Sequence, residues 1–253
     1  MKTIFRDSIL GLFSRRRWLQ MLGGLIFVPS TGLANSQSQP PKEQGNFREP
    51  DLVEIITYDP TIKLDIRYAT KNNFLGKKVY TEARAFLQRP AVEALVRVNQ
   101  SLREKGFGLL VFDGYRPWSV TKIFWDSTPP NKKQFVANPA QGSRHNRGCA
   151  VDLSLYDLKT GREIPMPSGY DEMTERAHPN YAGGTAEQRK MRDLLRAAME
   201  AEGFKVFDVE WWHFDYKDWR EYPILNISFD QIRQKPMQKI KTRQPRVSPK
   251  PVE

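Results

Sequence analysis

The sequence predicts an α+β fold in which a mainly antiparallel sheet is flanked by helices. Two long segments, residues 90–105 and 186–202, carry apolar side chains every three to four positions, which is typical of amphipathic helices. Segments rich in β-branched and aromatic residues lie between them in irregular order, without the strict alternation that predicts a parallel sheet. The chain has 253 residues, 39% hydrophobic content and no repeat of fixed period, so we expect one sizeable core.

The N-terminal 34 residues resemble an export signal. Arginines at positions 15–17 precede a short apolar run, "MLGGLIFV", and residues 32–34, Gly-Leu-Ala, suit a cleavage site. The stretch "SRRRWLQ" resembles the twin-arginine signal, which implies export of a folded protein to the periplasm. The apolar run is shorter than the ~20 residues that span a bilayer. We therefore expect cleavage and no stable membrane insertion afterwards; an uncleaved anchor is the alternative.

Two polar segments flank the predicted domain, which covers residues 50–233. Residues 35–49 are rich in proline and glutamine, as in a linker. Residues 234–253 contain four prolines and six basic residues against one acid, and they lack an apolar face. This composition predicts a disordered tail. A weak contact with anionic lipid or wall polymer is one role that its charge allows.

The net charge of +11 does not indicate a nucleic-acid-binding protein. Residues 1–34 carry a net charge of +4 and residues 234–253 carry +5, which leaves only +2 for the rest of the chain. The basic charge therefore belongs to the two ends, and the domain lacks a basic surface of its own. Cys149 is the only cysteine, which excludes an intramolecular disulfide. Because it stands between Gly148 and Ala150, we interpret it as a small core residue.

The first half of the domain predicts a strand, a loop and a helix. Residues 65–80, "DIRYATKNNFLGKKVY", contain β-forming residues that are broken by Asn-Asn and glycine. This pattern predicts a strand followed by a long loop. The helix over residues 90–105 begins near Pro90 and is ended by Gly106.

The next apolar strand delivers polar side chains at its end. Residues 109–117, "LLVFDGYRP", run from an apolar stretch into a turn, so that Asp113 and Arg116 arrive where the strand ends. A short helix is expected from Ser119 to about Trp125.

The second half predicts two more strands around the second helix. Residues 150–157 alternate so that Asp152 faces away from Val151 and Leu153. The helix over residues 186–202 is ended by a glycine, and residues 204–216, "FKVFDVEWWHFDY", predict a strand, either straight or bent.

Two patches together offer the donor set of a catalytic zinc site. Such a site uses three protein ligands, leaves a fourth position to water, and keeps a nearby carboxylate that is not a ligand. His145 and Asp152 stand seven residues apart in "SRHNRGCAVD", where Gly148 allows a turn between them. In "EWWHF", His213 would complete the ligand set and Glu210 would serve as the base. The sequence therefore predicts one Zn2+ per chain.

Each patch alone also has an ordinary interpretation. A histidine in a glycine-containing loop is commonly a surface residue, and "EWWHF" also fits the aromatic edge of a core. Glu210 and His213 are three residues apart, so a straight strand would direct them to opposite faces. The metal-site interpretation therefore requires a bulge or a turn around Trp211 and Trp212. His178 has no such partner and is expected at the surface.

The two motifs resemble those of the zinc D-alanyl-D-alanine dipeptidases of the vancomycin-resistance type. "SRHNRGCAVD" matches Ser-x-His-x-x-Gly-x-Ala-x-Asp, and "EWWHF" matches Glu-x-x-His. The segments "RYATKNNF", "LLVFDGYRP", "LYDLKTGREIPMP" and "GYDEMTERAH" resemble the family in the same order, from about residue 51 to residue 223. The resemblance implies the fold that this group of DD- and LD-peptidases shares with the Hedgehog signalling domain.

The resemblance also implies a role for each matching residue. His145, Asp152 and His213 would bind zinc, Glu210 would act as general base and acid, and Arg116 would stabilise the oxyanion.

Three further residues would contact the substrate. Asp171 of "GYDEM" would receive the ammonium group, and Ser143 and Asp113 would lie beside the dipeptide. Asp171 as a plain helix N-cap and Asp113 in a structural salt bridge with Arg116 are the alternatives.

The implied activity is hydrolysis of the D-Ala-D-Ala dipeptide to free D-alanine by a zinc metallopeptidase. The resistance-type enzymes act in the cytoplasm, whereas the signal predicts export, so we expect a role in peptidoglycan fragment turnover or salvage. The alternatives are an exported DD-carboxypeptidase or LD-endopeptidase, or a wall-peptide-binding module without catalysis. Glu210 argues against the binding module, because a binder needs no base beside the metal.

Overall fold

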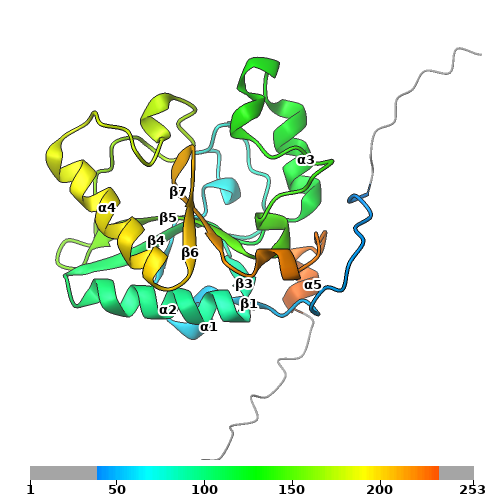
Figure 1. Ribbon diagram of the computed structural model, residues 1–253, viewed down its shortest axis with the longest axis horizontal. Coiled ribbons are helices and arrows are strands. Elements are labelled where there is room, and N and C mark those ends of the chain that lie inside the picture. The colour runs from blue at the N-terminus through cyan, green and yellow to red at the C-terminus, as the bar shows by residue number, and fades with distance from the viewer. Residues whose placement is uncertain (1–38, 234–253) are drawn as a thin grey trace, which may run out of the picture. The chain divides into compact units, whose positions relative to one another are not determined.

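The computed structural model describes residues 39–233 (Figure 1). The predicted signal peptide and the predicted basic tail lie outside these residues. The strands are β1 (Leu52–Glu54), β2 (Lys63–Leu64), β3 (Phe86–Gln88), β4 (Phe107–Asp113), β5 (Ala150–Asp157), β6 (Phe204–Phe207) and β7 (Glu210–Tyr216). The helices are α1 (Ile55–Tyr58), α2 (Arg89–Arg103), α3 (Trp118–Ser127), α4 (Ala186–Ala201) and α5 (Phe229–Arg233).

Five strands form the central sheet in the order β2-β4-β5-β7-β6. β2 runs parallel to β4, and the other neighbouring strands are antiparallel. β1 and β3 form a separate antiparallel pair. The predicted α+β class with a mainly antiparallel sheet is confirmed.

The two predicted amphipathic helices are α2 and α4, which lie side by side against the sheet (Figure 1). Pro90 stands in the first turn of α2, where its missing N–H costs no helical hydrogen bond. Thr185 caps α4 through the backbone N–H of Gln188, and the Gln188 side chain caps it in return. Pro90 at the start of α2 and the capping box of α4 explain why both helices begin where the sequence pattern predicts.

One face of strand β5 packs into the core and the other face carries a predicted site residue, as the alternation of its sequence predicted. Val151, Leu153 and Leu155 belong to the large apolar cluster that also contains the buried faces of α2 and α4. Asp152 points to the other side of the strand, together with Ser154. The helices therefore stabilise the sheet from one face and leave the opposite face for chemistry.

The strand predicted at the start of residues 65–80 is wrong. Only Lys63–Leu64, just before it, pairs with the sheet, and Asp65 N makes a last hydrogen bond to Val111 O, at 2.8 Å. The chain then forms a 3-10 turn over Arg67–Ala69 and a loop. Asn73 Nδ2 donates to three carbonyl groups of this segment, those of Arg67, Thr70 and Lys77. These bonds fold the segment back on itself and compete with strand pairing.

The single strand predicted over residues 204–216 is two strands joined by a tight turn. Phe207 pairs with Glu210, and Val206 pairs with Phe214, so residues 211–213 of β7 have no partners on β6. This irregularity is the bulge that the metal-site interpretation requires. It allows Glu210 and His213 to face the same side of the sheet.

The residues that precede β1 are fixed to the domain. We name residues 39–50 the N-terminal strap. Within it, Glu43 accepts hydrogen bonds from Arg147 and, at 2.6 Å, from the backbone N–H of Ile224. Arg48 N donates to Glu221 O at 2.7 Å. Glu43 and Arg48 of the predicted linker therefore contact the folded body. Across residues 39–233 no helix combines the length and apolar character that crossing a membrane requires.

Candidate metal centre

Three predicted ligands converge from different elements of the fold. His145 begins a 3-10 turn, His145–Arg147, and Asp152 lies in β5. Gly148 connects them with φ of 68°, a left-handed conformation that favours glycine. His213 lies on β7 directly opposite Asp152 in the register of the two strands. Neighbouring residues in register place their side chains on the same face, so β5 and β7 bring Asp152 and His213 together.

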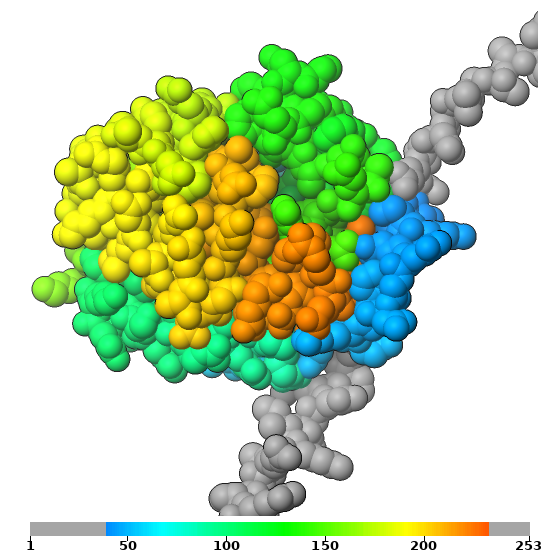
Figure 2. All heavy atoms as spheres, in the orientation of Figure 1, coloured from blue at the N-terminus to red at the C-terminus, as the bar shows by residue number. Residues whose placement is uncertain are grey.

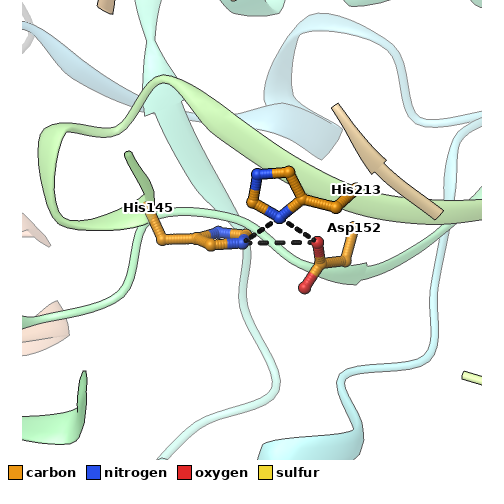
Figure 3. A group of neighbouring side chains, drawn as sticks. All are labelled: His145, Asp152 and His213. Atoms are coloured by element: carbon orange, nitrogen blue, oxygen red, sulfur yellow. Dashed lines mark hydrogen bonds and ion pairs between the residues drawn. The ribbon is translucent and has the colours of Figure 1, made fainter. Parts of the chain in front are cut away.

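The three ligand atoms form a nearly equilateral triangle (Figure 3). His145 Nε2 lies 3.1 Å from His213 Nδ1 and 3.3 Å from Asp152 Oδ1, and His213 Nδ1 lies 3.0 Å from Asp152 Oδ1. Tetrahedral zinc with bonds of about 2.0–2.1 Å separates its ligand atoms by about 3.3 Å. All three side chains are buried. The triangle therefore has the size that a zinc ion requires.

The second nitrogen of each histidine fixes which nitrogen faces the triangle. His145 Nδ1 lies 2.7 Å from Gly114 O, which can only accept a hydrogen bond. His213 Nε2 lies 2.9 Å from Asp215 Oδ1. With a metal in the triangle, each imidazole would donate outward through this nitrogen and direct the lone pair of the other nitrogen at the metal, the arrangement that metal-ligating histidines adopt. Asp152 Oδ1 is a buried oxygen without a hydrogen-bond partner in residues 39–233. A metal ion in the triangle would satisfy all three atoms, so the residues fit zinc.

The charges of the triangle favour a cation. Burial alone would raise the pKa of Asp152, but the two histidines outweigh burial and hold this pKa well below its usual range. Burial alone would lower the pKa of His213, but Asp215 and Asp152 raise this pKa to about 10. Without a metal the imidazole therefore keeps a proton between two carboxylates. A metal ion would replace that proton, so binding should release it.

Glu210 lies beside the triangle without belonging to it. Its Oε2 is 3.9 Å from His213 Nδ1, farther than a hydrogen bond reaches. Burial raises the pKa of Glu210 to about 8, against the opposing effect of His213. A carboxyl group whose pKa lies near neutral pH is suited to exchange a proton with a reacting group.

Arg116 is held on the other side of Asp152. Its Nε and Nη2 donate to Asp113 Oδ2 at 3.0 and 2.8 Å, and Nη2 lies 3.7 Å from Asp152 Oδ2. Its guanidinium also lies 4.5 Å from the ring centre of Phe124. The structure therefore contains the salt bridge that the sequence left open as an alternative. Because Asp113 binds only Nε and Nη2, the salt bridge does not exclude the oxyanion role.

Asp113 does not reach the substrate cavity. Its carboxylate accepts from Arg116, from the Tyr80 hydroxyl at 2.8 Å and from the backbone N–H of Gly114 at 2.9 Å. The side chain is 1% exposed. It was predicted beside the substrate, and the structure places it behind Arg116 as the group that orients the guanidinium.

Asp171 occupies a strained position at the cavity wall. Its φ of 60° is left-handed, and no other non-glycine residue within 39–233 has a positive φ. Tyr68 Oη donates to Asp171 Oδ1 at 2.9 Å, whereas Oδ2 is buried without a partner. Burial raises the pKa of Asp171 to about 7. Its side chain caps no helix, in contrast to the N-cap alternative.

Figure 2 shows a hollow between the segment around α3 and the segment around β7. Here a cavity of about 330 Å3 is lined by the three ligands, by Glu210, Arg116 and Asp171, and by Ser143. Ser143 Oγ accepts from the backbone N–H of His145 at 3.2 Å, which leaves its hydroxyl proton available. The predicted site residues other than Asp113 therefore line one cavity.

Two side chains that orient the ligands were not predicted from the sequence. Asp215 binds His213 Nε2, and it could have been found because residues two apart on a strand share a face. Tyr170 donates its hydroxyl to Asp152 Oδ2 at 2.9 Å. No spacing rule connects Tyr170 with Asp152, because the contact joins a loop to a strand. Cys149 and His178 lie as predicted, the first buried and the second exposed.

A family model and two relatives similar in sequence to this chain carry the description of D-alanyl-D-alanine dipeptidases. The family model of the peptidase M15 D-Ala-D-Ala dipeptidases matches residues 48–231. A D-alanyl-D-alanine dipeptidase of Escherichia coli K12 is 34% identical over 179 residues, which cover 71% of this chain and 91% of the relative. One of Enterococcus faecium is 36% identical over 187 residues, 67% of this chain and 91% of the relative. Among solved structures, an LD-carboxypeptidase aligns at 19% identity and a TM-score of 0.41, over 70% of this chain and 74% of that chain.

Proposed function

Because the chain belongs to the D-Ala-D-Ala dipeptidase family of zinc peptidases, we propose that its cavity hydrolyses D-Ala-D-Ala to two molecules of D-alanine, with Glu210 as proton carrier. The observation that carries this proposal is the buried triangle of His145, Asp152 and His213, with a carboxylate beside it that is not a ligand. That combination suits hydrolysis by water, since a binding module gains nothing from a buried base.

The residues of the cavity have different roles in the hydrolysis of one dipeptide. Zinc, when bound, supplies Lewis-acid chemistry that lowers the pKa of water to ~7 and polarises the peptide carbonyl. Glu210 accepts a proton as the water oxygen bonds to the carbonyl carbon. The same carboxyl then gives this proton to the amine nitrogen as the C–N bond breaks. Burial raises the pKa of Glu210 in the metal-free site, and a cation in the triangle would lower this pKa again, so that the carboxylate is ionised when it accepts the first proton.

Two other residues act on charges of the substrate. Arg116, held in place by Asp113, directs fixed donors toward the oxygen that gains negative charge in the transition state. One such donor contributes about 3 kcal/mol to the transition state. Asp171 Oδ2, buried and unpartnered, would pair with the free ammonium group of the dipeptide. A longer peptide lacks a charged ammonium at that position, so the pairing favours dipeptides.

The first prediction concerns Glu210. Glu210→Ala should lower kcat by about 10^2- to 10^4-fold, because a general base contributes that much, while the zinc content stays at one per chain. The measurement is release of free alanine from D-Ala-D-Ala by purified protein lacking residues 1–34, with zinc determined in parallel.

The substrate series decides between related activities. D-Ala-D-Ala should be cleaved, and L-Ala-L-Ala and an acyl-capped D-Ala-D-Ala should not. Release from the capped peptide instead would indicate a wall carboxypeptidase. An absence of release at full zinc loading would indicate a binding module.

We propose further that the protein is exported and acts on peptidoglycan fragments. The support is the twin-arginine-like stretch within residues 1–34 and the apolar run after it. Cell fractionation followed by N-terminal sequencing of the recovered protein tests this. A mature N-terminus near residue 35 in the periplasmic fraction is expected, and the full-length chain in the cytoplasm would contradict it.

A further inference from the structure

The cavity is lined by three arginines, Arg116, Arg144 and Arg147, and two of them are committed to the protein itself. Arg147 donates to Tyr222 O and to Glu43, and its side chain is 11% exposed. Arg116 gives two donors to Asp113 and is 9% exposed. Neither guanidinium is free to leave its partner for a ligand carboxylate.

Arg144 differs from both in its environment. Its side chain is 37% exposed, and its one ion pair within residues 39–233 joins Nε to Asp215 Oδ2 at 3.4 Å. Its guanidinium lies 4.9 Å from the ring centre of Trp219 and 5.7 Å from that of Phe207. Aromatic rings support the plane of a guanidinium without using its N–H groups. Both Nη groups of Arg144 are therefore available to a ligand at the cavity wall.

A free dipeptide needs such a group. It carries an ammonium at one end and a carboxylate at the other, and Asp171 accounts only for the ammonium. The other acids that line the cavity, among them Glu210 and Glu172, would repel a carboxylate. Arg144 is attached to the His213 side of the triangle through Asp215, whereas Asp171 neighbours Tyr170, which binds Asp152. A cationic and an acidic side chain are thus linked to two different ligands of the metal triangle, and both line the cavity.

We propose that Arg144 binds the C-terminal carboxylate of the substrate and makes the site selective for peptides with a free carboxyl end. This inference rests on the proposed dipeptidase function. The chemical class recognised is a carboxylate one residue beyond the scissile bond. A guanidinium and a carboxylate form charge-assisted hydrogen bonds, so loss of the substrate charge should weaken binding about 10- to 100-fold.

The test compares D-Ala-D-Ala with D-alanyl-D-alaninamide, which keeps the ammonium and lacks the carboxylate. Dissociation constants are measured by calorimetry on zinc-loaded protein in which Glu210→Ala slows turnover. Arg144→Gln in this background should weaken the binding of D-Ala-D-Ala but not that of the amide. The two dissociation constants should then lie within about threefold of each other. Arg144→Lys should keep part of the preference, because it keeps the charge without the planar fork.

Arg220→Gln is the matched control. Arg220 is exposed and lies 4.1 Å from the same Trp219 ring, yet it does not line the cavity. The substitution removes an equal charge nearby. The Arg220→Gln variant should therefore prefer D-Ala-D-Ala over the amide as strongly as the Glu210→Ala parent does. If Arg144→Gln weakens the acid and the amide equally, Arg144 acts only through Asp215 and His213, and the proposal is wrong. Hydrolysis by protein with Glu210 intact is assayed separately, so a failure of the dipeptidase function would be seen independently of carboxylate binding.

Discussion

Asp171 carries its carboxyl group at a position that costs the folded protein free energy. The residue is left-handed, one of its oxygens is buried without a partner, and burial raises its pKa from the usual value to about 7. A carboxyl group whose pKa is raised by folding destabilises the folded state wherever the unfolded chain would ionise it. The same features leave the oxygen ready for a ligand cation. The Asp171 side chain therefore lowers the stability of the folded protein and at the same time offers an acceptor for a ligand cation.

Asp171→Asn should stabilise the metal-free protein at pH 8 and leave its stability unchanged at pH 3. The cost of the carboxylate is absent below the unfolded pKa near 4, builds up between pH 4 and pH 7, and is constant above. We expect a gain on the order of 1–3 kcal/mol at pH 8, because asparagine tolerates the left-handed backbone and keeps an acceptor for Tyr68. Urea denaturation at both pH values measures this. An equal effect at pH 3 and pH 8 would show that ionisation is not the cause.

Tyr170→Phe should weaken zinc binding about tenfold without changing the fold. The hydroxyl holds Asp152 Oδ2 and so turns Oδ1 toward the histidines, whereas the ring, stacked on Phe112 at 4.7 Å, is kept in phenylalanine. Competition with a chelator gives the zinc dissociation constant. Tyr156→Phe is the control, because it removes a hydroxyl on β5 whose partner is Thr61 O, away from the ligands. Equal effects of the two substitutions would contradict an orienting role for Tyr170.

At the scale of elements, local sequence patterns correctly predicted the helices and strands whose signals lie within their own segments. The helices α2 and α4 and the strand β5 follow from apolar spacing, prolines, glycines and caps within each segment. The bulge of β7 was anticipated only because chemistry required Glu210 and His213 to share a face. The β6–β7 turn was missed, since the apolar and aromatic run continues through Asp208 and Val209 without a glycine or proline. The contacts of Tyr170 and Arg144 depend on long-range packing, which no local pattern encodes.

Gly148→Ala should destabilise the turn that separates two ligands. A Cβ at this position would lie 2.4 Å from Leu52 Cδ2, and φ of 68° is unfavourable for alanine. We expect a loss of about 1–3 kcal/mol in the free energy of unfolding, together with weaker zinc binding. Adding Leu52→Ala removes the clash but not the backbone strain, so Gly148→Ala should still destabilise the Leu52→Ala protein. No destabilisation in that background would mean that sterics alone demand the glycine.

At the scale of the whole molecule, the N-terminal strap is attached to the region of the site. Arg147 follows His145 by two residues, is largely buried, and shares Glu43 with the backbone of Ile224. Leu225 N in turn donates to Asn146 O at 2.9 Å. Residues near both ends of the domain thus meet beside the turn that carries a metal ligand.

Glu43→Ala should destabilise the protein by about 2–4 kcal/mol, because it leaves the Arg147 guanidinium buried without its acid. Replacing both residues, Glu43→Ala with Arg147→Met, should cost less than the sum of the single changes. A double-mutant cycle by urea denaturation measures the coupling. Additive effects would show that the strap contact contributes little.

The strap also sets an order of events during synthesis of the chain. Glu43 leaves the ribosome early, whereas its partners Arg147 and Ile224 follow 104 and 181 positions later. Until residue 225 has been made, the turn that holds His145 lacks two backbone partners, Tyr222 O for Arg147 and Leu225 N for Asn146 O. A polypeptide that stops before this point would carry both ligands of the first motif without the surroundings that hold them. The surroundings of the metal centre can therefore be completed only after nearly the entire domain has been translated.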